Sequence, residues 1–325
     1  MALTPIDEVH ALQIQAGTLG RKAGHAFEDS ICEYINALAF PLVGDLPAEG
    51  HVFSGNPGSL LLRYILRFLG YDDVQSVIAL STGALATSED GRHWLSINGA
   101  DVRRCKSDIV ITLNRLDAPS VTVGVSTKQC NNPKPTNAQL YFTTARGFTK
   151  LLRDNGVPVS DLALTALRHF CGDPGFRPLD VPGATDGRLT DPRRFFWEEM
   201  TAGAREEWEA IFSDRQDDVT RLLLQKAYID DPFVPDFLIH KTRLATSVDS
   251  TEVAIYDIGE LITLSRQYQG YTTRPYSVRK GSYRDPIGVT HLAPRFGVVQ
   301  MQRGGQEQHP DQLQFNLEAG YFYKI

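Results

Sequence analysis

Residues 106–129 read KSDIVITLNRLDAPSVTVGVSTKQ, and this segment predicts the centre of the fold. Two runs rich in β-branched residues, 107–113 and 120–128, flank the short polar loop NRLDAP. β-Branched residues favour strands, and a loop of a few residues between two such runs is typical of a β-hairpin. The segment therefore predicts two neighbouring strands, around which the rest of the chain can be arranged.

The polar residues of this hairpin are expected at one edge of the sheet. Alternate side chains of a strand share a face, which puts Ser126 and Lys128 on one face. Val123 and Val125 then lie on the opposite face. Asp108 opens the first strand and precedes Ser126 by 18 residues (126 − 108 = 18), a separation that suits two hairpin-linked strands. Asp108 and Ser126 should therefore end at the same edge.

Helical periodicity is clear in two segments before the hairpin. From Ala23 to Leu38 the apolar residues recur at helical spacing, and Glu28 sits at the edge of the apolar stripe. The run SLLLRYILRFLGY, residues 59–71, predicts a second and more buried helix with Ser59 near its N-cap.

The remaining segments give weaker, local expectations. We expect strands at 76–88 and 233–242, turns at 89–91 and 98–99, helical spacing at 136–154 and 193–227, a short helix at 260–268, and paired strands at 296–302 and 313–325. The run DLALTALRHF, residues 161–170, fits either a strand or a short helix.

Composition bounds the class of protein. The chain has 325 residues, 42% of them hydrophobic, which suffices for one large core or one core with a smaller appendage. No apolar run approaches the roughly 18 residues of a membrane span, and the N-terminus lacks the features of a secretion signal. The four cysteines are scattered without a Cys/His ligand pair, which disfavours a zinc site and indicates free thiols. We expect a cytoplasmic protein with no membrane association.

Three residues of these segments match the chemistry of phosphodiester hydrolysis. This reaction needs a metal that neutralises developing charge and activates water, and a cation near the nucleophile or the scissile phosphate. Carboxylates on a helix and a strand, with a lysine on the neighbouring strand, form a compact solution. Glu28, Asp108 and Lys128 supply that set.

Together these segments resemble the PD-(D/E)XK nuclease superfamily, and within it the type II restriction endonucleases. GRKAGHAFEDSICEYI (20–35) is similar to the family's first helix with its glutamate, KSDIVI (106–111) to the PD strand with serine in place of proline, and VSTKQ (125–129) to the (D/E)XK strand. The resemblance covers residues 20–153 in the family's order of helix, strand, strand and helix.

The resemblance implies an α/β fold with a restriction-endonuclease-like central mixed β-sheet flanked by helices, and an elaborated α+β C-terminal half. Residues 1–160 would form the PD-(D/E)XK-like catalytic core. Residues 161–325 would complete the fold and contribute DNA recognition, either as a separate portion or within one continuous domain.

The chain departs from the family at Ser126, which is a neutral hydroxyl where the motif has its middle acid. The helix after the lysine strand is the source of a replacement acid in some restriction enzymes, but the window LYFTTARGFTK contains none. Glu28 is therefore the expected replacement ligand. The resemblance then implies Mg²⁺ held by Asp108 and Glu28, with Lys128 orienting or deprotonating the attacking water, and Ser126 or a strand carbonyl completing the shell.

DNA contacts are expected in two regions. Arginine suits contact with guanine and glutamine or asparagine with adenine, while lysines and hydroxyls hold phosphates. The residues chosen on this basis are Arg104, Lys106, Asn131, Asn132 and Lys134 near the catalytic strands, and Arg274, Arg279, Lys280, Arg284, Gln300, Gln302, Arg303, Gln306 and Gln308 in the C-terminal region. The expected partners are double-stranded DNA, a second copy of the chain in a homodimer, and a protective DNA methyltransferase of the same system that is not a stable partner.

Other interpretations stay open. Asp108 can instead cap a turn or pair with Arg103 or Arg104, and Lys128 and Glu28 can be ordinary surface residues. Asp236, in the literal PD of Val234-Pro235-Asp236, has no acid-x-lysine after it and is interpreted as a turn residue. The rival functions are a modification-dependent or repair nuclease with the same core, a catalytically silent DNA-binding module, and an α/β enzyme unrelated to nucleic acid.

Overall fold

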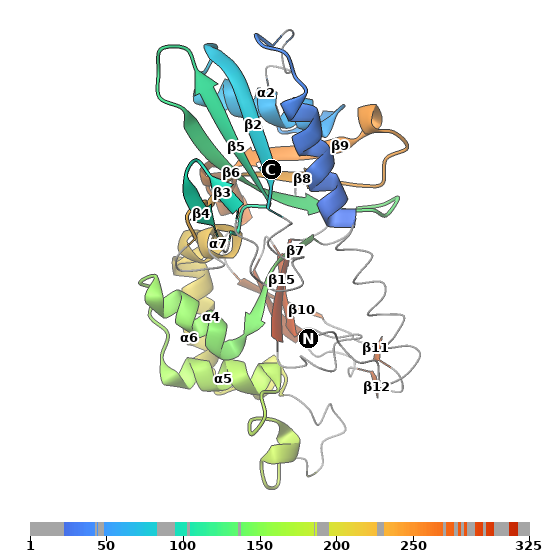
Figure 1. Cartoon of the computed structure of the whole chain (residues 1–325). Helices are drawn as coiled ribbons and strands as arrows, with labels where there is room; N and C mark the ends of the chain where they lie inside the picture. Colours follow the sequence, from blue (N-terminus) through green and yellow to red (C-terminus); the bar gives the residue numbers. More distant parts are fainter. Residues whose placement is uncertain are drawn as a thin grey trace. The chain divides into compact units, whose positions relative to one another are not determined.

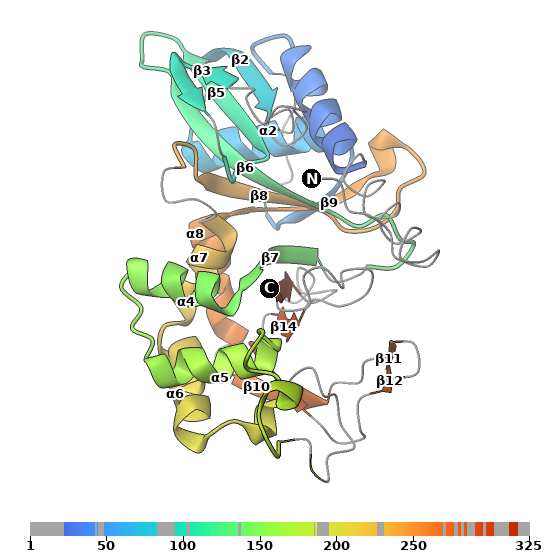
Figure 2. The same ribbon diagram turned by 60° about the horizontal axis from the view of Figure 1, so that its bottom comes forward.

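A computed structural model gives the fold of the chain in two compact units (Figures 1 and 2). The sheet unit comprises Thr18–Ala138, Leu223–Leu264 and Ala319–Ile325, and the helical unit Met1–Gly17, Gln139–Leu222 and Ser265–Glu318. The structure describes residues 23–42, 44, 49–82, 95–102, 105–135, 138–184, 186, 195–225, 231–268, 271–275, 279–280, 283–284, 290–294, 297–301 and 312–317.

A six-stranded mixed sheet is the centre of the sheet unit. Its strand order is β1-β9-β8-β6-β5-β2, in which β6 and β8 run parallel and the other neighbours antiparallel. The strands are β1 (Val52–Ser54), β2 (Val74–Ser81), β5 (Ile109–Arg115), β6 (Val121–Gln129), β8 (Pro235–Lys241) and β9 (Glu252–Asp257). The predicted mixed sheet with flanking helices is confirmed, and so is the β5–β6 hairpin.

Two helices bury their apolar faces against this sheet. One spans residues 23–36, close to the predicted 23–38, and the other is α2 (Pro57–Leu69). Ile31 and Ile35 of the first helix belong to the same buried core as Val123 and Val125 of β6. The strand face that carries Val123 and Val125 is thus the one that faces the helices, as the period-two pattern predicts.

The start of α2 differs from the expectation. Asn56 is the N-cap, and its side chain accepts hydrogen bonds from the backbone N–H groups of Gly58 and Ser59. Ser59 is therefore inside the first turn. Pro57 takes the first helical position, where its missing N–H has no cost.

The opposite face of the sheet carries a small hairpin, β3 (Leu95–Ile97) and β4 (Ala100–Val102). Its turn is the predicted Asn98-Gly99, with φ of 52° and 80°, the positive values that a tight hairpin turn requires. Asn98 Nδ2 donates to the hydroxyls of Thr112 (3.1 Å) and Thr122 (2.6 Å), which ties the turn to β5 and β6. The turn predicted at 89–91 lies outside the described residues.

Further helical elements accompany the sheet unit and the helical unit. They are α8 (Ile258–Ser265) with η3 (Val248–Ser250), and α4 (Ala145–Asp154), α5 (Asp161–Cys171), α6 (Ala202–Asp214), α7 (Gln216–Gln225), η1 (Pro178–Asp180), η2 (Trp197–Glu199) and η4 (Arg266–Tyr268). The strands outside the main sheet are β7 (Ala138–Thr144), β10 (Tyr271–Pro275), β11 (Arg279–Lys280), β12 (Tyr283–Arg284), β13 (Thr290–Pro294), β14 (Gly297–Met301) and β15 (Gln312–Leu317).

In the helical unit the expectation for residues 136–154 is partly wrong, and the open choice for residues 161–170 is decided. Helical spacing was expected over 136–154, but β7 occupies the first half and pairs with β15, so α4 begins only at Ala145. The run at 161–170 is helix α5, capped by the Ser160 hydroxyl. The predicted pairing of the C-terminal strands is confirmed by antiparallel β14 and β15. No helix within the described ranges is long and apolar enough to cross a membrane.

Candidate active site

The backbone of Asp108 is held between two strands. Its N–H donates to Val125 O (2.8 Å), and its carbonyl accepts from Thr82 N (3.0 Å). The Thr82 hydroxyl donates to Ser107 O at 2.7 Å. Asp108 therefore lies immediately before β5, with little backbone freedom.

The Asp108 carboxylate receives its hydrogen bonds on one oxygen. Ser126 Oγ donates to Oδ2 at 3.2 Å and Thr127 N donates to the same atom at 2.6 Å. The expectation that Asp108 and Ser126 meet at one sheet edge is thus confirmed. Oδ1 has no hydrogen-bond donor among the described residues, so this oxygen is available to a cation.

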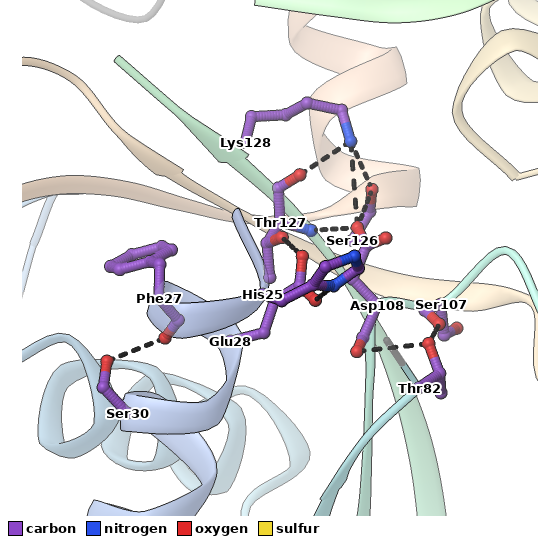
Figure 3. Close-up of polar contacts among 10 residues, drawn as sticks. All are labelled: His25, Phe27, Glu28, Ser30, Thr82, Ser107, Asp108, Ser126, Thr127 and Lys128. Atoms are coloured by element: carbon purple, nitrogen blue, oxygen red, sulfur yellow. Dashed lines mark hydrogen bonds and ion pairs between the residues drawn. The ribbon is translucent and has the colours of Figure 1, made fainter. Parts of the chain in front are cut away.

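Lys128 folds back along its own strand toward this carboxylate (Figure 3). Its Nζ donates to Thr127 O (2.7 Å) and to Ser126 Oγ (3.0 Å), and lies 3.8 Å from Asp108 Oδ2. The side chain is mostly buried, so the ammonium group has a defined position beside Asp108.

Glu28 reaches the same place from the helix at residues 23–36 (Figure 3). Its Oε1 accepts from Thr127 Oγ1 at 3.0 Å, and its Oε2 lies 3.3 Å from His25 Nδ1. Burial raises the pKa of the Glu28 carboxyl, and the negative charge of Asp108 raises this pKa further. A cation beside the two carboxylates would offset this burial and repulsion and so stabilise the charged form of Glu28.

The donor set fits a hard divalent cation. Asp108 and Glu28 offer carboxylate oxygens, and Mg²⁺ is commonly bound by one or two carboxylates together with water and substrate phosphates. Within the described ranges, no group of three or more His, Cys, Asp and Glu side chains has the geometry to hold a metal.

Two further ionisable groups lie near enough to Lys128 to be affected by its charge. His240 pairs with Lys128 in the β6–β8 register and is buried, and burial together with the charge of Lys128 lowers the pKa of His240 to about 4. Burial and the charge of Lys128 likewise lower the pKa of Lys106 to about 8. The Lys106 backbone N–H donates to an Asp231 carboxylate oxygen. Neutral His240 is thus compatible with a charged Lys128.

The expected DNA contacts fall in several places. Lys106, Asn131, Asn132 and Lys134 lie in the sheet unit, the last three in the segment after β6. In the helical unit Arg274 lies on β10, Arg279 and Lys280 on β11, Arg284 on β12 and Gln300 on β14. Arg104, Gln302, Arg303, Gln306 and Gln308 lie outside the described residues.

Three neighbours of the site were missed in the sequence. His25 is one helical turn before Glu28, a spacing that could have drawn attention to it. Thr127 lies between Ser126 and Lys128 but on the helix-facing side, where it meets Glu28. Lys241, whose Nζ donates to Asn131 Oδ1 at 3.1 Å, has no local signal because β8 becomes a neighbour of β6 only through the fold.

Asp236, the aspartate of the literal PD sequence at 235–236, has a structural role. Its Oδ2 accepts from Gly124 N at 2.9 Å, at an irregularity in the β6–β8 pairing. The side chain thereby satisfies a backbone donor at the point where the pairing of the two strands is irregular. The interpretation of Asp236 as a turn residue is wrong, because Asp236 lies inside strand β8 and its side chain contacts the backbone of β6.

A helix glutamate, a strand aspartate and a lysine on the adjoining strand meet at one edge of a mixed sheet, the layout that the PD-(D/E)XK resemblance predicts. No protein-family model matches the chain. No curated protein matches it by sequence. Among solved structures the chain is similar to the restriction endonuclease MspI in complex with its cognate DNA, with 11% identity and a TM-score of 0.45 over 80% of this chain and 78% of that one. At this identity the likeness concerns the fold.

Proposed function

We propose that the chain is a divalent-metal-dependent endonuclease of the type II restriction class, which cuts double-stranded DNA at a specific sequence. The observation that carries the proposal is the convergence of Asp108, Glu28 and Lys128 at one sheet edge. A buried acid and a partly buried acid beside a positioned lysine match the needs of phosphodiester hydrolysis better than those of a purely structural cluster.

The proposed roles follow from the contacts. Asp108 and Glu28 bind Mg²⁺, which when bound neutralises charge at the scissile phosphate and makes a water more acidic. Lys128 lies where its ammonium group can orient the attacking water or stabilise the phosphate charge. Ser126 holds Lys128 and Asp108 together, since its hydroxyl contacts both.

The partner assignments belong to the same proposal. Two copies related by a two-fold axis would present two such sites to the two strands of a symmetric DNA sequence. The segment after β6, with Asn131, Asn132 and Lys134, would contact DNA beside the catalytic lysine, and the C-terminal residues would read bases. A cognate methyltransferase would protect the host's own DNA.

Ser126 favours a second candidate function, a catalytically silent DNA-binding module. The acid that most members of the superfamily carry here is replaced by a hydroxyl whose contacts are made to Asp108 and Lys128. A weaker charge at the site would bind a divalent cation less tightly. Such a module would bind DNA with the usual salt dependence but would not cut it.

Plasmid cleavage separates these candidates. Supercoiled plasmids, unmethylated and methylated, are incubated with the wild type in Mg²⁺ or in EDTA. A restriction enzyme cuts the unmethylated plasmid in Mg²⁺ alone, whereas a modification-dependent nuclease cuts the methylated one. Salt-dependent DNA binding without cutting of either plasmid would refute the nuclease and leave the silent module.

A further inference from the structure

Thr127 contacts both proposed metal ligands. Its backbone N–H donates to Asp108 Oδ2 at 2.6 Å, and its hydroxyl donates to Glu28 Oε1 at 3.0 Å (Figure 3). The bond to Glu28 is shielded from water, because Thr127 is only 9% exposed and Glu28 8%. A hydrogen bond to a carboxylate that is shielded from water is stronger than one at the surface, and it fixes the orientation of the carboxylate.

The alternation of the strand explains why this task falls to Thr127. Ser126 and Lys128 share one face of β6, whereas Thr127 faces the helices with Val123 and Val125. An acid at position 126 would have approached Asp108 from its own strand. Glu28 comes instead from a helix on the other face, and Thr127 is the β6 residue that meets it.

We infer that Thr127 is a positioning residue for metal binding: its hydroxyl fixes the Glu28 carboxylate beside Asp108, and so compensates for the acid that position 126 lacks. The inference rests on the proposed function. His25 holds the other oxygen of Glu28 at 3.3 Å, so the carboxylate is restrained at both oxygens. Partners of this kind orient metal ligands, and their loss typically weakens metal affinity about 10- to 100-fold.

The substitution Thr127→Val isolates the hydroxyl. Valine has the same branched shape and keeps the backbone N–H that donates to Asp108, so the strand and its packing are retained. The conservative variant Thr127→Ser keeps the donor. Thr122→Val is the matched control, because Thr122 lies on the same strand and its hydroxyl accepts from Asn98, away from Asp108 and Glu28.

Calorimetric titration of each DNA-free protein with Mn²⁺ and with Mg²⁺ gives the metal affinity, and urea unfolding without metal gives the stability. We expect Thr127→Val to bind metal about 10- to 100-fold more weakly. Thr127→Ser and Thr122→Val should stay within about threefold of the wild type. Cleavage by Thr127→Val should recover when the Mg²⁺ concentration is raised, because the catalytic groups themselves are intact.

Wild-type metal affinity in Thr127→Val would overturn the inference while leaving the proposed function in place. A loss of stability in Thr127→Val without a loss of metal affinity would do the same, since it would show a purely structural hydroxyl. A wild type that neither binds metal nor cuts DNA would overturn the proposed function, and the inference with it.

Discussion

Ser126 Oγ donates a hydrogen bond of 3.2 Å to Asp108 Oδ2 across the β5–β6 hairpin. The two residues stand where the superfamily motif would place two acids, and here one of them is a hydrogen-bond donor to the other. Lys128 Nζ donates to the same hydroxyl at 3.0 Å, so the uncharged Ser126 side chain links the acid Asp108 to the lysine. One carboxylate at this edge thus comes from the hairpin, and the second, that of Glu28, comes from the helix at residues 23–36.

The first prediction concerns the lysine. Lys128→Ala should reduce the cleavage rate at least about 100-fold, because a positioned charge beside the reacting phosphate is lost. DNA affinity should change far less, since one ammonium group among many contacts is removed. Lys150→Ala is the control, because Lys150 is exposed and pairs with Asp154 within α4, away from Asp108 and Glu28. Equal rates for Lys128→Ala and the wild type would remove Lys128 from the catalytic set.

The second prediction restores the missing acid. Ser126→Asp should lower the Mg²⁺ concentration needed for cleavage, because a third carboxylate joins the site. Without metal the same variant should be less stable than the wild type, since the new charge lies beside Asp108 in a buried position. Thermal unfolding with and without Mg²⁺ measures both effects, with Ser126→Ala as the uncharged comparison. An unchanged metal requirement in Ser126→Asp would show that position 126 does not face the cation.

The third prediction is a pH dependence of stability. The pKa of His240 is lowered from 6.5 to about 4, so the folded state binds its proton less readily than the unfolded state does. A depressed pKa contributes stability that is present above pH 6.5 and is lost as the pH falls toward 4. Between neutral pH and pH ~5 the wild type should lose about 2 kcal/mol more than His240→Gln. Urea unfolding at both pH values tests this, and parallel losses in the two proteins would contradict it.

The fourth prediction concerns the close packing of Gly124 in β6 against Ser107 and Val234. A Cβ on Gly124 would clash with Ser107 Oγ and lie 2.7 Å from Val234 O, and the backbone oxygen cannot move aside. Gly124→Ala should therefore cost about 1–3 kcal/mol of unfolding free energy and slow cleavage by shifting β8 against β6. Gly203→Ala in α6 is the control: its Cβ would meet Leu162 at an ordinary 3.8 Å, and the change should be neutral or stabilising by up to about 1 kcal/mol. A harmless Gly124→Ala would contradict the tight packing described.

The predictions of structure that were confirmed depend on local sequence patterns. The β5–β6 hairpin and the helix at 23–36 depend on residues close in sequence, so alternation and helical spacing predicted them and brought Asp108 to Ser126. The parallel pairing of β6 with β8 joins residues more than a hundred positions apart, so the pairing of His240 with Lys128 and of Lys241 with Gln129 could not be predicted from local sequence. The segment of β7 was expected to be helical from its local spacing. Its strand structure depends on pairing with β15, which lies far along the chain and gives no local signal.

Thr127 and His25 were missed for a different reason. Motif reasoning attends to acids and lysines, and a threonine in a strand is ordinarily explained by its β propensity. Their roles depend on which face of β6 meets the helix that carries Glu28, and this is a property of the packed structure.

Removal of the Asp108 carboxylate tests the proposed metal-dependent cleavage most directly. Single-turnover digestion of a long unmethylated DNA of mixed sequence should be compared for the wild type and Asp108→Asn at equal occupancy of DNA. We predict discrete fragments from the wild type in Mg²⁺, none in EDTA, and a rate at least about 100-fold lower for Asp108→Asn. Cleavage by the wild type without a metal, or equal rates for the two proteins, would contradict the assignment of this site.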